Sequence, residues 1–135
     1  MTSPVGIVRR SGKAQDIAAA HPHAFSGILL DAPCSGTGTL ARNPELRLRL
    51  SPDKLKAAVA LQSELLDAVW ASLRPGGMLI YSTCALNREE NEDQLTAFLS
   101  RTADARLEEQ ELILPERPEE EGQDILFHAL LRRSV

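Results

Sequence analysis

The sequence predicts an α/β fold organised around two neighbouring strands. Two short apolar runs, residues 28–30 and 78–81, are each followed by small polar residues and by one of the two cysteines, Cys34 and Cys84. Because proline, serine and glycine follow the first run, a strand that ends in a loop is favoured over a helix. If the two strands are parallel neighbours, both thiols lie at the carboxyl edge of one sheet, where open α/β sheets bind ligands.

Length and composition are those of one globular domain. The chain has 135 residues, 43% hydrophobic and 25% charged, and we expect residues 1–135 to form a single domain in which residues 1–24 are hard to place. No run approaches the roughly 20 apolar residues of a membrane span. The two cysteines are fifty positions apart and match neither a disulfide scaffold nor a zinc pattern, so we expect a cytoplasmic protein with reduced thiols.

Charge is distributed unevenly along the chain. The net charge of −4 argues weakly against a nucleic-acid partner, but residues 42–56 carry five basic side chains against two acidic ones. Residues 108–124 carry eight acidic side chains against one arginine. The basic segment either binds phosphates beside the predicted site or is a solvated face, and the charge pattern leaves both open.

The first part of the chain predicts one clear strand and one long loop. Residues 5–8 are compatible with a short edge strand, and residues 14–21 with a helical turn. The strand from Ser26 to Ala32 is the first well-marked element. The loop over residues 33–50 follows it, and long loops in compact domains are often functional.

A helix is predicted after this loop. Ser51 is suited to the N-cap position and Pro52 to the first helical position, and apolar residues at spacings of three and four continue the pattern to Leu73. Trp70 on this helix is expected in the core rather than as a platform for base stacking. Residues 74–77 contain one proline and two glycines, which predicts that the helix stops and the chain turns there.

The last part of the chain predicts a further helix and a pair of strands. Asn87 and Glu90 have the spacing of a capping box and mark the start of a helix. Two strands without a helix between them predict an antiparallel hairpin. The predicted elements are a strand over residues 78–83, a helix that includes residues 95–99, a strand over 106–114, a surface turn over 115–124 and a closing strand over 125–132.

The two cysteines are candidates for nucleophilic chemistry. A thiol is a strong nucleophile only when its pKa of about 8.5 is lowered or a base assists it. Asp31 lies three residues before Cys34 and can accept a hydrogen bond or exchange a proton, while Gly36 and Gly38 let the backbone approach a ligand. A single cysteine is more often a small buried hydrophobic residue, but two at equivalent strand ends favour chemistry.

Other site types fit the residues poorly. A phosphate-binding P-loop needs a lysine that is absent after Gly38, and a cysteine phosphatase needs an arginine where Leu40 stands. A cysteine hydrolase needs a histidine partner, and none is placed for that role. His21 and His23 form one loop pair without further ligands, so we expect no metal site.

The segment 31–45, Asp-Ala-Pro-Cys-Ser-Gly-Thr-Gly-Thr-Leu-Ala-Arg-Asn-Pro-Glu, resembles motif IV of the NOL1/NOP2/Sun family of RNA (cytosine-5) methyltransferases. The segment 73–84, which ends in Tyr-Ser-Thr-Cys, and residues 87–92 are similar to motif VI and the helix after it. The resemblance covers roughly residues 25–133 and is closest to the bacterial ribosomal RNA methylases of the family.

The resemblance implies a covalent mechanism. The cysteine of the Thr-Cys motif, Cys84, is implied as the nucleophile that adds to carbon 6 of cytosine, so that carbon 5 accepts a methyl group from S-adenosylmethionine. Cys34 is implied in release of the product, and Asp31 in contact with the cytosine edge. The resemblance further implies that the cofactor is contacted by Asp31 and Pro33. It implies RNA contacts for Arg42, Asn43, Arg47 and Arg49. Residue chemistry alone does not choose between the two thiols as nucleophile.

The chain departs from the family pattern upstream of Phe25. The glycine-rich cofactor loop and the acids of the first three family strands have no counterpart, so the chain looks like the C-terminal half of a catalytic domain, a partial Rossmann-like sheet. Of the family order 3-2-1-4-5-7-6 it would keep strands 4-5-7-6. The strand from Ser26 to Ala32 then becomes an open apolar edge, which predicts a homodimer across it or across the surface that the missing half would cover. The alternative function is a non-catalytic remnant that serves as an RNA-binding or interaction module.

Overall fold

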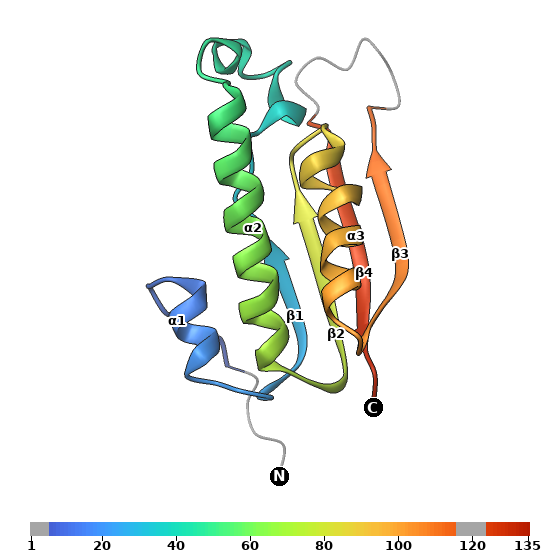
Figure 1. The fold of residues 1–135 in the computed structure, drawn as a ribbon. Helices are drawn as coiled ribbons and strands as arrows, with labels where there is room; N and C mark the ends of the chain where they lie inside the picture. Colours follow the sequence, from blue (N-terminus) through green and yellow to red (C-terminus); the bar gives the residue numbers. More distant parts are fainter. Residues whose placement is uncertain (1–5, 116–123) are drawn as a thin grey trace.

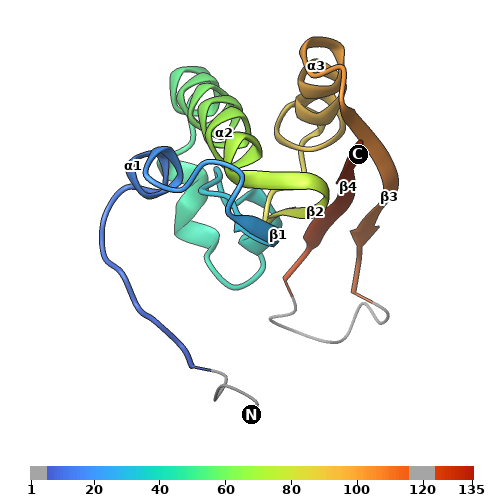
Figure 2. The ribbon, with the colours of Figure 1, turned by 90° about the horizontal axis from the view of Figure 1, so that it is seen from below.

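One four-stranded sheet with helices on one face forms the protein. The computed structural model describes residues 6–115 and 124–135. The sheet order is β1-β2-β4-β3. Figures 1 and 2 show α1 (Ala14–Ala19), α2 (Pro52–Ser72) and α3 (Glu92–Arg101) on the same side of the sheet. The α/β fold class is therefore confirmed, and the order of the strands is the predicted 4-5-7-6 arrangement.

The sheet combines one parallel and two antiparallel pairings. β1 (Phe25–Asp31) runs parallel to β2 (Leu73–Thr83), and α2 connects them. β4 (Leu126–Arg133) pairs antiparallel with β2 and with β3 (Ala105–Ile113). The predicted C-terminal hairpin is thus confirmed. Because β1 and β2 are parallel, their carboxyl ends meet at one edge of the sheet.

The long helix α2 begins where the sequence predicts. Ser51 has extended backbone and its Oγ accepts a hydrogen bond from the amide of Lys54, 3.2 Å away. Trp70 is only 5% exposed, and its ring lies 5.3 Å from that of Phe98 on α3 in an edge-to-face arrangement. Trp70 is a core residue, as expected, and it joins the two helices that cover the sheet.

One local prediction is wrong, and two others gain detail in the structure. Residues 6–8 are not a strand, and residue 5 lies outside the described residues, as does most of the predicted acidic turn. The helix stops at Ser72, as predicted, and β2 begins directly after it at Leu73, which is fully buried and pairs with Phe25. The register shifts between this pair and the pair of Gly27 with Met78, so the predicted turn over residues 74–77 is an irregularity at the start of β2 rather than a separate loop. The loop over residues 33–50 contains two short 3-10 helices, Thr37–Thr39 and Pro44–Leu48.

The predicted capping box is also wrong. Asn87 makes no side-chain capping bond, and the segment Arg88–Glu90 is a 3-10 turn that precedes α3. Glu90 is fully buried and turns toward the loop after β1 instead of capping a helix. The spacing of the two residues was therefore a sign of tertiary contacts rather than of a helix start.

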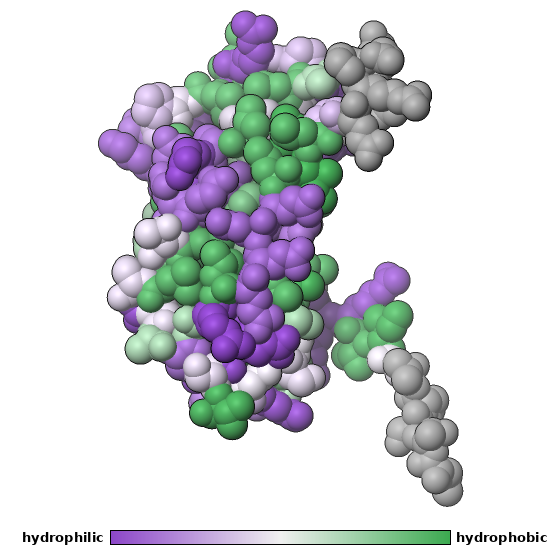
Figure 3. Space-filling model, turned by 90° about the vertical axis from the view of Figure 1, so that its right-hand side faces the viewer, coloured by the Kyte–Doolittle hydropathy of each residue, from purple (hydrophilic) through white to green (hydrophobic). Residues whose placement is uncertain are grey.

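The edge formed by β1 is open. Leu29 is 68% exposed, Ile28 is half-buried, and Leu30 is buried in the core. A hollow of about 310 Å³ lies beside this strand, with a lining that includes Ile17, Phe25 and Ile28. By contrast, the side of the molecule that carries β3 interleaves hydrophilic and hydrophobic groups, as Figure 3 shows. No helix among the described residues is long and apolar enough to cross a membrane.

A candidate active site at the carboxyl edge of the sheet

The two cysteines meet at the carboxyl edge of β1 and β2. The Sγ atoms of Cys34 and Cys84 are 2.9 Å apart, and both residues are half-buried free thiols. Backbone hydrogen bonds hold the two segments on either side of the pair. The amide of Ala32 donates to the carbonyl of Ser82 at 2.9 Å, and the amide of Gly38 donates to the carbonyl of Cys84 at 2.8 Å. The predicted convergence of the thiols is present in the fold.

The environment of Cys34 keeps its thiol protonated. Burial and the contact with the Cys84 thiol raise the pKa of Cys34 from 9.0 to about 12. At neutral pH this thiol is therefore an S–H group that can donate a hydrogen bond to the neighbouring sulfur.

Asp31 is the last residue of β1 and lies next to Ser82 in the β1–β2 register. Its carboxylate is exposed, and Oδ1 accepts a hydrogen bond from the Oγ of Ser82 at 3.1 Å. The sequence indicated Asp31 but not Ser82. The pairing of the two residues follows from strand register, which a single sequence does not reveal.

A buried carboxylate holds the loop that carries Cys34. Glu90 accepts hydrogen bonds from the amide of Ser35 at 2.7 Å, from the Oγ of Ser35 at 2.6 Å and from the Nε2 of Gln62 at 3.1 Å. Gln62 on α2 also donates to the carbonyl of Pro33 at 2.9 Å. The hydroxyl of Tyr81 donates to the Glu90 carbonyl at 2.8 Å, and burial raises the pKa of Tyr81. The local sequence pattern does not indicate Gln62, and it wrongly places Glu90 in a capping box.

A second set of contacts joins the same loop to the segment after Cys84. The Oγ1 of Thr37 donates to the Oδ1 of Asn87 at 2.8 Å and accepts from the amide of Leu86 at 2.8 Å. Thr83 donates through its Oγ1 to Asn91, which in turn donates to the carbonyl of Ala85. Each cysteine is therefore fixed by hydrogen bonds on both of its flanks.

The four basic or amide residues predicted at RNA occupy the loop between β1 and α2. Arg42 forms an ion pair with Asp124 at 2.8 Å, and the side-chain amide of Asn43 donates to Thr39 at 3.3 Å. Arg47 and Arg49 are exposed. Arg42 and Asn43 thus support the loop, while Arg47 and Arg49 present their charges to solvent.

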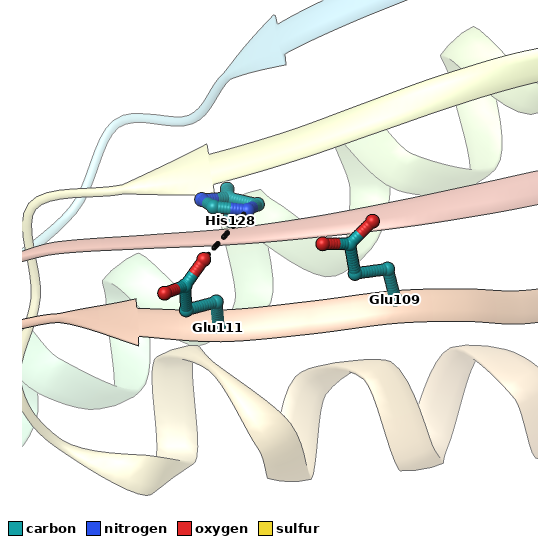
Figure 4. A group of neighbouring side chains, drawn as sticks. All are labelled: Glu109, Glu111 and His128. Carbon is teal, nitrogen blue, oxygen red and sulfur yellow. Dashed lines mark ion pairs between the residues drawn. The ribbon is translucent and has the colours of Figure 1, made fainter.

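A separate cluster of polar side chains lies on the β3–β4 hairpin. Each of Glu109, Glu111 and His128 has one atom that could ligate a metal ion, and these three atoms lie within 4.8 Å of one another. Figure 4 shows the three side chains on neighbouring strands. The Nε2 of His128 is 3.7 Å from a carboxylate oxygen of Glu111, its direct partner across the strands. His21, for which we expected no metal, contacts the carbonyl of Ile17 at 2.8 Å.

The sequence of residues 5–132 matches the model of a protein family described as 16S rRNA methyltransferase RsmB/F. The chain belongs to the RsmB/F family. The match covers most of the chain, including both cysteine segments, so the predicted relationship to ribosomal RNA methylases of the NOL1/NOP2/Sun type is confirmed. Members of this family are S-adenosylmethionine-dependent rRNA methyltransferases.

Curated relatives of this RsmB/F chain carry the name ribosomal RNA small subunit methyltransferase B. The protein from Vibrio cholerae is 45% identical over 112 residues, which are 81% of this chain and 26% of the relative. The protein from Xanthomonas campestris is 52% identical over 82 residues, which are 61% of this chain and 19% of the relative. The chain therefore spans about a quarter or less of the length of these two proteins.

Two larger proteins of known structure contain a fold similar to that of this chain. NSun6 from Pyrococcus horikoshii, determined with SFG, is 28% identical with a TM-score of 0.73, and the match covers 93% of this chain and 34% of NSun6. A methyltransferase homolog from Pyrococcus horikoshii is 29% identical with a TM-score of 0.68, and the match covers 94% and 44% of the two chains. The four-stranded sheet is thus part of a Rossmann-like methyltransferase fold.

The described residues do not by themselves form a pocket for the family's methyl donor. The hollow beside β1 is lined almost entirely by apolar groups and includes no acid that could bind ribose hydroxyls. Asp31 lies at the end of the strand, and the carbonyl of Pro33 is occupied by Gln62.

Proposed function

We propose that this chain carries the nucleophile-bearing part of an RNA cytosine-5 methyltransferase that acts on ribosomal RNA. The observation that carries the proposal is the pair of thiols, 2.9 Å apart at the carboxyl edge of the sheet and close in sequence to Asp31. Membership of the RsmB/F family supplies the reaction class, because its members methylate rRNA. Cytosine specificity and covalent catalysis are the further steps that we propose here.

The proposed chemistry begins at Cys84. Its thiolate adds to carbon 6 of cytosine, so a sulfur–carbon bond forms while the electrons of the ring double bond make carbon 5 nucleophilic. Cys34 keeps its proton, in accord with its raised pKa, and its S–H group faces the sulfur of Cys84. This arrangement supports Cys84 rather than Cys34 as the attacking group. Asp31 contacts the polar edge of the base and stabilises the adduct.

Product release is assigned to Cys34. Once carbon 5 has accepted a methyl group, its proton must leave and the sulfur–carbon bond must break. Cys34 lies 2.9 Å from Cys84, so its S–H group can give its proton to the departing Cys84 sulfur, and the Cys34 thiolate that remains takes the proton from carbon 5. S-adenosylmethionine supplies the methyl group in the family, and Asp31 and Pro33 are the residues of this chain that we assign to its binding.

RNA is expected to contact the loop between β1 and α2. Arg47 and Arg49 are exposed and carry positive charge toward solvent beside the loop of Cys34. We assign RNA contacts to Arg42 and Asn43 as well. The ion pair with Asp124 positions the side chain of Arg42. Such contacts to phosphates would make binding weaken steeply as salt concentration rises.

Covalent trapping tests the division of roles. We expect the chain to form an adduct with a short rRNA-like oligonucleotide that contains 5-azacytidine, since nitrogen at ring position 5 makes carbon 6 more electrophilic. Cys84→Ala should abolish the adduct, whereas Cys34→Ala should retain it. Denaturing gels and mass spectrometry of the linked peptide measure both results. Loss of the adduct in Cys34→Ala with retention in Cys84→Ala would reverse the assignment.

The open edge of β1 favours a second candidate function, a non-catalytic RNA-binding or interaction module that pairs with another copy through this edge. Leu29 is 68% exposed there, and the apolar hollow lies beside it. Calorimetric titration with S-adenosylmethionine separates the two functions. We expect no binding at millimolar ligand if the chain is a non-catalytic module. Micromolar binding would show a cofactor pocket, completed across two copies of the chain, and would favour the methyltransferase.

A further inference from the structure

The thiol pair has a second chemical capacity that does not depend on RNA or on a methyl donor. Cys34 and Cys84 are the only cysteines in the sequence, and their sulfur atoms are already in contact at 2.9 Å. A disulfide bond requires the two sulfur atoms to approach to about 2 Å, which is a small further movement. Both residues are half-buried, so a small oxidant has access to them while a bulky one is restricted.

The surrounding hydrogen bonds favour the intramolecular product. The amide of Ala32 bonds to the carbonyl of Ser82, and the amide of Gly38 bonds to the carbonyl of Cys84. These two bonds lie on either side of Cys34 and fix its backbone against the end of β2. The thiols therefore have a high effective concentration toward one another, far above that of any thiol on a second molecule.

We propose that Cys34 and Cys84 form an oxidative modification site, which reacts with hydrogen peroxide and closes into an intramolecular disulfide. This site lies beyond the proposed methylation chemistry and does not rest on it. In the reduced state the pair is free for nucleophilic attack. In the oxidised state neither sulfur is a nucleophile, so the modification blocks the candidate active site until a thiol reductant opens the bond.

The reaction balances with peroxide as the only oxidant. The sulfur of Cys84 attacks one peroxide oxygen, the oxygen–oxygen bond breaks, and a sulfenic acid and one water are formed. The sulfur of Cys34 then attacks the sulfenic sulfur, its proton goes to the departing hydroxide, and a second water leaves. Two thiols lose two hydrogen atoms in all, and peroxide is reduced to water. The same steps balance with the two sulfur atoms exchanged, because each lies 2.9 Å from the other.

Peroxide treatment of the purified 135-residue chain tests the proposal. We expect both free thiols to disappear together, the monomer to become lighter by two hydrogen atoms, and a Cys34–Cys84 cross-linked peptide to appear in a non-reducing digest. Dithiothreitol should restore both thiols. The rate should be independent of protein concentration. Sulfinic or sulfonic acid at either cysteine without a cross-link, or disulfide-linked dimers as the main product, would overturn the proposal.

Single variants provide the matched control. Cys34→Ser removes the resolving thiol but preserves a small polar side chain, so Cys84 should then accumulate as sulfenic acid, detectable with dimedone, and form no intramolecular cross-link. Cys84→Ser should likewise leave Cys34 without a partner and form no intramolecular cross-link. Loss of two hydrogen atoms on peroxide treatment of either single variant would contradict a bond between these two sulfur atoms. Circular dichroism verifies that both variants are folded.

Discussion

Replacement of Glu90 by alanine is expected to destabilise the chain by about 3 kcal/mol or more, because the buried donors of Ser35 and Gln62 would lose their acceptor. Glu90 is fully buried, and its carboxylate accepts three hydrogen bonds at 2.6–3.1 Å. The loop that carries Cys34 depends on these bonds. Urea unfolding followed by circular dichroism measures the change in the free energy of unfolding.

Two matched variants make this result specific. Glu89→Ala removes an exposed carboxylate one residue away and should change stability by less than about 0.5 kcal/mol. Glu90→Gln preserves one acceptor oxygen, so its effect should fall between the two. If Glu90→Ala unfolds at the same urea concentration as Glu89→Ala, the buried carboxylate does not hold the loop.

Gly38→Ala is expected to distort the active-site loop and to lower stability by about 3 kcal/mol. A Cβ atom at this position would lie 2.6 Å from the carbonyl oxygen of Cys84 and 2.7 Å from that of Ile125. Both obstacles are backbone atoms and cannot rotate away. The loop would have to move, and the hydrogen bonds from Gly38 to Cys84 and from Ile125 to Gly38 would be lost.

Gly6→Ala is the control for this substitution, since a Cβ atom at Gly6 meets nothing within 4 Å. Urea unfolding should place Gly6→Ala within about 0.5 kcal/mol of the unsubstituted chain. The yield of peroxide-induced cross-link in Gly38→Ala should also fall, because the thiols would no longer be held together. A Gly38→Ala variant with unchanged stability and unchanged cross-linking would contradict the close backbone packing at this position.

Local signals in the sequence were sufficient for most of the fold. Ser51 and Pro52 mark the start of α2 through well-defined capping chemistry, and the observed helix begins there. The apolar runs that end near Asp31 and Thr83 became β1 and β2. The sheet order came from the family resemblance, and the structure has that order. Capping and hydrophobic runs are properties of adjacent residues, so a single sequence reveals them.

Contacts between distant segments could not be predicted in the same way. Asn87 and Glu90 have the spacing of a capping box, yet Glu90 bonds to Ser35, which is 55 residues away. Proline and glycine at residues 75–77 correctly predicted the end of α2, but they did not reveal that these residues would form an irregular start of β2. For Glu90, which is fully buried, tertiary packing outweighs the local capping preference.

The reactive groups of the candidate site were predicted from the sequence, but the residues that orient them were not. Asp31, Cys34 and Cys84 were indicated by their place after apolar runs, and the fold brings the two thiols into contact. Ser82 and Gln62 were not indicated, because one depends on strand register and the other on the face of α2 that meets the loop. Reactive groups have distinctive chemistry, whereas the residues that orient them are ordinary polar side chains.

Alkylation measures most directly whether the thiols of Cys34 and Cys84 differ in reactivity. The chain is treated at pH 7 with less iodoacetamide than thiol, and the labelled peptides are quantified by mass spectrometry. We expect Cys84 to be labelled first at pH 7 and the labelling of Cys34 to increase as the pH rises, because burial raises the pKa of Cys34 and lowers its thiolate fraction. Labelling of Cys34 before Cys84 at pH 7 would contradict this expectation.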